Sequence, residues 1–244
     1  MDTERIIEKL DAYLGRNDYA GAERHLHYWI GDALSRQDRR DEFTLRNELM
    51  GLCRKLGKKE DALMNMERTL ELGKTLGLEH TVSWGTALVN AATVCKAFSM
   101  PERSIALFEQ ASACYEALLP DHDGRLAALQ NNMALTLMDL GRLDEAESAF
   151  RKALSVLAKR ERAKGEEAIT WLNLADLQAM RGASPEILRD RLENARAALE
   201  DKSNVYDGNY AFIIEKCAPV FGHYGYNEYK DILLKRAKDI YERA

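Results

Sequence analysis

The organisation of the chain is clearest in Asn131-Asn-Met-Ala-Leu-Thr-Leu-Met-Asp-Leu-Gly-Arg-Leu-Asp-Glu-Ala-Glu-Ser-Ala-Phe-Arg-Lys-Ala-Leu154. Apolar residues recur at helical spacing up to Leu140, a short polar break follows, and the same period then resumes. Gly141 suits a helix C-terminus, where a side chain disfavours the left-handed backbone. Asp144 and Glu145 place negative charge at the positive end of the next helix. The stretch therefore predicts two helices joined by a tight turn.

This plan recurs along the chain at a spacing of 42 residues. The turn position is held in succession by Gly57, Ser99, Gly141, Ala183 and Gly225. Nine residues later comes a column of large apolar residues, Met66, Phe108, Phe150, Leu192 and Leu234. Three residues further lies a column of small residues, Thr69, Ala111, Ala153, Ala195 and Ala237. A single helix pair cannot bury its apolar stripe alone, so this period predicts stacked helical hairpins.

The quoted stretch resembles a tetratricopeptide repeat of the 42-residue variety found in kinesin light chains and many bacterial repeat proteins. The resemblance covers essentially the whole chain, most clearly residues 45–200, with departures at Ser99, Ser104 and Pro219. Pro219 falls inside an expected helix and should kink or shorten it. The resemblance implies an all-α fold of about twelve helices in six hairpins, wound into a right-handed α-α superhelix.

We expect the whole chain, residues 1–244, to form one solenoid. Its predicted parts are an N-terminal hairpin at 1–40, four core repeats at 41–200 and a tyrosine-rich capping hairpin at 201–244.

Composition narrows the class of protein. Hydrophobic residues make up 46% of the chain and charged residues 31%, which argues against disorder. The chain has a net charge of −5, whereas nucleic-acid binders usually carry a basic surface. The basic stretch 159–164 is interrupted and followed by glutamates, so we interpret it as a solvated helix face. No window is apolar enough for a membrane span, and the charged N-terminus does not resemble a signal peptide.

Residue chemistry points away from catalysis. The four cysteines form no Cys-x-x-Cys pair, so we expect a reducing, cytoplasmic setting. Cys53, Cys95 and Cys217 fall in apolar columns of the repeat, and we predict that these three are small core residues. No phosphate-cradling glycine loop, nucleophile elbow or recognisable carboxylate pair is present. We therefore expect no enzymatic activity, no cofactor and no metal.

The resemblance also implies where a ligand binds. In tetratricopeptide proteins the first helix of each pair lines a concave groove that usually holds an extended or helical peptide. Alignment of the first helices puts Asn90, Asn132 and Asn173 in one column, with Glu48 before them and Lys216 after. In the kinesin light chain type, asparagine here hydrogen-bonds a peptide backbone, as an amide with both donor and acceptor is able to do. The alternative is that these asparagines bond a neighbouring helix and set the superhelix pitch.

Arg54 and Lys96, near first-helix ends, are weaker candidates for the same groove. They would hold an acidic peptide or a C-terminal carboxylate, or simply complement the helix dipole. In the tyrosine-rich end, Tyr224, Tyr226 and Tyr229 would cover the end of the solenoid or form a second surface for recognition or self-association.

These features predict a non-catalytic cytoplasmic adaptor, monomeric or weakly dimeric, that binds a peptide segment of a partner protein. One alternative is a signalling-peptide receptor that lacks its own DNA-binding domain, because the repeats begin almost at once. Another is a self-assembling scaffold.

Overall fold

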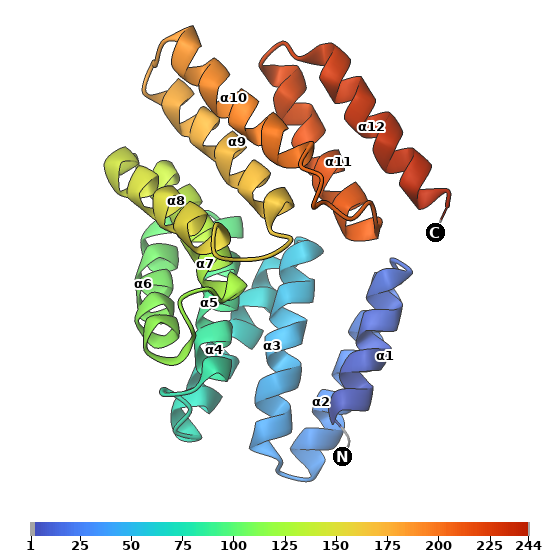
Figure 1. The fold of residues 1–244 in the computed structure, drawn as a ribbon. Helices are drawn as coiled ribbons and strands as arrows, with labels where there is room; N and C mark the ends of the chain where they lie inside the picture. The colour runs from blue at the N-terminus through green and yellow to red at the C-terminus, as the bar shows by residue number, and fades with distance from the viewer. Residues whose placement is uncertain (1–2, 244) are drawn as a thin grey trace. The chain divides into compact units, whose positions relative to one another are not determined.

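The computed structural model describes residues 3–243 and consists of α-helices joined by short turns. Figure 1 shows the helices following one another as hairpins. They are α1 (Thr3–Gly15), α2 (Tyr19–Ser35), α3 (Arg39–Lys55), α4 (Lys59–Thr75), α5 (Val82–Ala97), α6 (Pro101–Leu118), α7 (Gly124–Asp139), α8 (Leu143–Leu157), α9 (Lys164–Met180), α10 (Pro185–Leu199), α11 (Gly208–His223) and α12 (Asn227–Tyr241). The predicted all-α fold of twelve helices in consecutive hairpins is confirmed.

The chain divides into two compact units, Met1–Leu119 and Pro120–Ala244. In the first unit the closest packing joins α3 to α4 and α5 to α6, and α2 also packs on α3. In the second unit α7 pairs with α8, α9 with α10 and α11 with α12, while α9 also contacts α8 and α11. Each unit therefore builds its core between neighbouring hairpins, as a repeat architecture requires. The single solenoid over 1–244 stays a prediction.

The turns follow the predicted column with one correction. In the turns inside the pairs α3–α4, α5–α6, α7–α8, α9–α10 and α11–α12, the residue with positive φ is Gly57, Ser99, Gly141, Gly182 and Gly225, respectively. The fourth of these is Gly182, at φ +69°, rather than Ala183 as the 42-residue spacing predicts. Glycine adopts this conformation without the steric cost that a Cβ brings, so the turn forms one residue early.

The core columns also hold, again with one correction. The large residues Met66, Phe108, Phe150 and Leu192 are buried, but Leu234 is 40% exposed. The preceding Leu233 is fully buried in its place. In α12 the buried residues Tyr229, Leu233, Ala237 and Ile240 lie at helical spacing on one face, which leaves residue 234 on another.

Cys53, Cys95 and Cys217 are buried, as predicted, and all four cysteines are free thiols. Burial raises the pKa of the Cys53 thiol to about 11 and that of Cys217 to about 12. Both therefore remain protonated near neutral pH and are packing residues rather than nucleophiles. The predicted shortening at Pro219 is not seen, because α11 runs 16 residues with the proline inside it.

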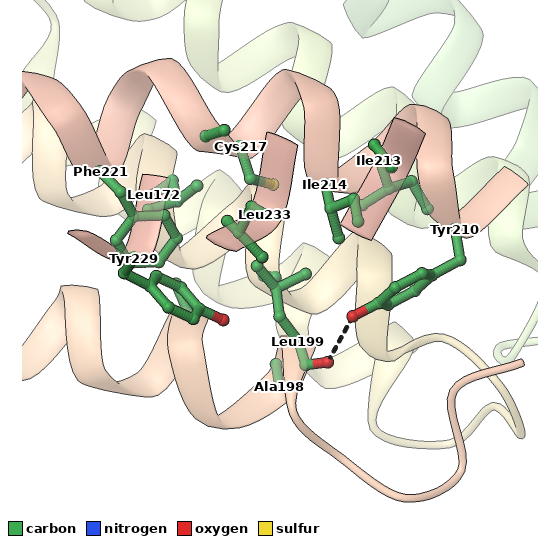
Figure 2. Close-up of a cluster of buried hydrophobic side chains, with 14 of the residues drawn as sticks. Leu172, Ala198, Leu199, Tyr210, Ile213, Ile214, Cys217, Phe221, Tyr229 and Leu233 are labelled. Atoms are coloured by element: carbon green, nitrogen blue, oxygen red, sulfur yellow. Dashed lines mark hydrogen bonds between the residues drawn. The ribbon is translucent and has the colours of Figure 1, made fainter. Parts of the chain in front are cut away.

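Two of the C-terminal tyrosines belong to the core between α9, α10, α11 and α12. Figure 2 shows Tyr210 pointing at the end of α10, where its hydroxyl donates to the carbonyl oxygen of Leu199 at 2.9 Å. The Tyr229 hydroxyl donates to Glu200 at 2.8 Å, and the Tyr229 ring packs edge-on against Phe221. Arg236 bonds both Glu200 and the Tyr210 hydroxyl, so these polar tips are satisfied within the last two hairpins.

Candidate functional site

The second unit contains a cavity of about 590 Å³ between α7 and α9, closed at one end by the loop after α8. We call it the α7–α9 cavity. Its apolar lining consists of Gly124, Ala127, Ala128, Leu135, Leu157 and Ile169. Its polar lining consists of Asp123, Arg125, Asn131, Asn132, Arg160, Glu166 and Asn173. A concave surface that combines apolar side chains with convergent polar groups is typical of a ligand site.

Helical spacing explains why these side chains converge. On α7, residues 128, 132 and 135 lie on one face, and on α9, residues 166, 169 and 173 do the same. Each helix therefore presents an asparagine and a large aliphatic residue to the cavity.

The predicted asparagine column divides into two kinds of environment. Asn132 and Asn173 both line the cavity, and neither side chain hydrogen-bonds any residue between 3 and 243. Asn90, in the first unit, donates from Nδ2 to Oδ1 of Asn47 at 3.1 Å. Asn47 in turn donates to Glu48 at 3.2 Å. Asn90 on α5 is thus bonded to the neighbouring helix α3, as the alternative interpretation of the asparagine column expects.

Asn131, which the sequence did not single out, links the two helices of the cavity. Its Nδ2 donates to Thr170 Oγ1 at 2.9 Å and to the Ala127 carbonyl at 3.3 Å. Thr170 itself donates to the backbone oxygen of Glu166, one turn earlier on α9. The Asn131 Oδ1 is buried and has no partner among the described residues. This side chain fixes the spacing of α7 and α9 at the cavity wall.

The charged end of the cavity lies at the start of α7. Asp123 caps this helix by accepting from the Arg125 backbone N–H at 2.9 Å, and it also accepts from the Arg125 guanidinium at 2.9 and 2.7 Å. The side-chain hydrogen bond from Arg125, aided by the positive charge of Arg160, lowers the pKa of Asp123 to about 2. Asp123 is therefore ionised and engaged, whereas the Arg160 guanidinium has no hydrogen-bond or ion-pair partner in the described part of the chain.

The prediction that residues 159–164 form a solvated helix face is wrong. Because α8 ends at Leu157 and α9 begins at Lys164, this stretch is mostly a loop. Lys159 forms an ion pair with Asp121 at 2.7 Å, and Arg160 is half-buried against the cavity. Sequence spacing alone gave no signal for this placement, because it depends on where the loop folds back on α7.

The other predicted residues lie outside the cavity. Glu48 is half-buried, and burial raises its pKa. Arg54 and Lys96 lie in the last turns of α3 and α5, and Arg54 is exposed. Lys216 is exposed on α11, with its Nζ 5.4 Å from the centre of the Phe212 ring.

The three tyrosines proposed as a second surface are largely engaged. Tyr229 is buried and is a core residue. Tyr224 and Tyr226 are half-buried, and the Tyr224 hydroxyl donates to Asp176 at 2.8 Å. This placement resembles the capping interpretation more than an open contact surface.

One group of metal-ligand types occurs among the described residues: Glu23, Cys53 and Asp61, whose ligand atoms lie within 4.8 Å of one another. Lys58 already binds Glu23 at 2.5 Å, and the buried Cys53 thiol holds its proton. A cation would have to displace both, so this chemistry favours an ion pair beside a core thiol.

Comparisons with known proteins agree with this architecture. Residues 125–201, which include most of the residues that line the α7–α9 cavity, match the model of the tetratricopeptide repeat. Residues 125–201 are therefore a tetratricopeptide repeat region. A search of curated proteins finds no significant relative by sequence.

Several solved structures share the fold. BtubC (BKLC) from P. vanneervenii is 16% identical with a TM-score of 0.64, and the match covers 92% of this chain and 91% of that one. The kinesin light chain-like repeats of Podospora anserina are 19% identical with a TM-score of 0.59, covering 83% and 96%. The apo quorum sensor NprR from B. thuringiensis is 15% identical with a TM-score of 0.63, covering 99% and 65%. At these identities the likeness establishes the fold.

The tetratricopeptide fold is typical of protein–protein interaction and is typically non-catalytic. None of the helices within residues 3–243 is long and apolar enough to cross a bilayer.

Proposed function

We propose that this protein is a non-catalytic adaptor that binds a peptide segment of a partner protein in the α7–α9 cavity. The observation that carries the proposal is the pair of amides, Asn132 and Asn173, on facing helices without hydrogen-bond partners in the described chain. Polar side chains in a concave site are normally hydrogen-bonded, so two such amides suit a ligand with its own donors and acceptors.

A peptide main chain fits these requirements. It offers alternating N–H and C=O groups to the two amides, while its side chains pack on Leu135 and Ile169 in the same cavity. A neutral hydrogen bond contributes about 1 kcal/mol, so each amide that pairs with the main chain adds a modest increment to the affinity. The free thiols of the chain favour work in a reducing compartment such as the cytoplasm.

The test is affinity capture from lysate of the source organism with three versions of the full chain. The first is wild type, the second carries Asn132→Ala with Asn173→Ala, and the third carries Asn90→Ala. Circular dichroism first shows that all three are equally helical.

The proposal expects a protein retained by wild type and Asn90→Ala and lost from the double variant, since Asn90 is already bonded to Asn47. Equal retention by all three versions would place the binding site outside the cavity. A free small peptide retained in place of a protein would favour the signalling-peptide receptor, and concentration-dependent light scattering without a partner would favour the self-assembling scaffold.

A further inference from the structure

We infer that the segment bound in the α7–α9 cavity carries a single acidic side chain that pairs with Arg160. The inference rests on the proposed function and specifies the class of peptide. It follows from the surroundings of Arg160, which no repeat alignment selects.

Arg160 is a half-buried cation that is near enough to Asp123 to lower its pKa but forms no ion pair with any described residue. Its guanidinium lines the cavity and makes no hydrogen bond or ion pair with any residue from 3 to 243. A charge withdrawn from water and left unpaired is destabilising, whereas pairing with an anion recovers that free energy. The planar guanidinium also matches a carboxylate with two parallel hydrogen bonds. Asp123 is already held by Arg125, so the free positions on Arg160 are available to a ligand.

The position of Arg160 is fixed by a glycine. A Cβ placed on Gly124, the first residue of α7, would lie 2.5 Å from Nη1 and 2.6 Å from Cζ of Arg160. The guanidinium therefore rests directly on the backbone at the start of α7. A side chain held by packing loses little freedom when it binds, which favours affinity. The positive end of the helix dipole also favours an anion at this point.

The opposite charge in the cavity limits the ligand to one acid. Glu166 lines the cavity from α9, and its carboxylate forms no ion pair with the described residues. It repels a second carboxylate and favours a neutral or basic neighbour. Leu135 and Ile169 supply an aliphatic surface in the same cavity. The ligand class is thus a segment with one Asp or Glu beside an aliphatic residue, rather than an acidic run.

The probe is a library of acetylated and amidated nonapeptides, randomised at every position and presented to the labelled full chain. Capped ends ensure that any acidic preference comes from a side chain. Wild type is compared with Arg160→Glu, with Gly124→Ala and with the Asn132→Ala and Asn173→Ala double variant. Gly208→Ala is the matched control, since Gly208 likewise begins a helix after an aspartate cap but a Cβ there meets nothing within 4 Å.

Wild type should retain peptides with Asp or Glu at one fixed position, and replacing that residue by Asn or Gln should weaken binding at least about ten-fold. Arg160→Glu should exchange this preference for Lys or Arg. Gly124→Ala should reduce the acidic preference by displacing the guanidinium, and Gly208→Ala should leave it unchanged.

Peptides retained without an acidic preference, or with the same preference in Arg160→Glu, would overturn this inference and leave the proposed function intact. No retained peptide, or equal retention by the double asparagine variant, would overturn the proposed function and this inference with it.

Discussion

At the residue scale, one column of the repeat serves two purposes. Asn132 and Asn173 line the cavity and their side chains bond no residue between 3 and 243, whereas Asn90 donates to Asn47. The column itself is visible in the sequence because helix register fixes it. The sequence does not show which of these asparagines are already hydrogen-bonded, because that depends on which residue of the neighbouring first helix lies opposite each one. In the first unit that residue is an asparagine, which satisfies the amide.

A second residue-scale feature is the buried carboxylate of Glu42, which is 3% exposed between α3 and α4. It accepts from Arg46 Nε at 2.8 Å and from Arg68 Nε and Nη2 at 2.9 and 3.0 Å. Burial alone would raise the pKa of Glu42, but the hydrogen bonds from Arg68 and Arg46 outweigh it and lower the pKa below its usual 4.5. The ionised form is therefore the one that stabilises the fold.

Replacing this carboxylate should cost stability. Glu42→Gln leaves both arginines without their shared anion, and we expect the free energy of unfolding at pH 7 to fall by about 2 kcal/mol. Urea unfolding followed by circular dichroism measures the change. Glu71→Gln is the matched control, because Glu71 pairs with the same Arg68 at the exposed surface and should change stability by about 0.5 kcal/mol or less.

The pH dependence of unfolding in wild type and Glu42→Gln tests whether Glu42 acts through its charge. A carboxylate whose pKa is lower in the folded state stabilises the fold above its unfolded pKa and loses that contribution as pH falls through the folded pKa. The difference between wild type and Glu42→Gln should therefore be full at pH 7 and shrink progressively below pH 4.5. A difference that stays constant down to pH 3 would show that Glu42 does not act through its charge.

At the element scale, the helices and their ends were predictable because the signals are local. Apolar periodicity gave the helices, and the left-handed turn residue gave the hairpins. Two positions were predicted wrongly because the spacing is not exactly 42 residues everywhere. The turn uses Gly182 rather than Ala183 because glycine adopts the left-handed backbone more easily. The register of α12 buries Leu233 rather than Leu234. The loop at 158–163 was misassigned as helix because its alternating charges resemble a solvated helix face.

Exchanging serine and glycine at two equivalent turn positions should change stability in opposite directions. Ser99 adopts φ +60°, which is costly for a residue with a side chain, while Gly141 adopts φ +71° in the equivalent turn. Ser99→Gly should raise the free energy of unfolding by roughly 0.5–1 kcal/mol, and Gly141→Ser should lower it by a similar amount. Thermal and urea unfolding of the full chain measure both. Changes of the same sign in the two variants would contradict this explanation of the turns.

At the scale of the whole molecule, the period of the sequence predicts the architecture because each hairpin packs mainly on its neighbours. The class of function follows from that architecture. The site does not, because two units of the same repeat differ in whether their inner amides are satisfied. Arg160 and Asn131 were missed for the same reason: a loop residue and a bridging amide acquire their roles only from the packed neighbours, Gly124 and Thr170.

The central claim is that unpartnered amides in the α7–α9 cavity bind a peptide. The most direct measurement is a fluorescence anisotropy titration of one labelled peptide, taken from the captured partner, against the full chain. The account predicts that Asn132→Ala with Asn173→Ala weakens the affinity by about thirty-fold, the equivalent of two neutral hydrogen bonds, and that Asn90→Ala leaves it unchanged. The same affinity for wild type, the double variant and Asn90→Ala would contradict it.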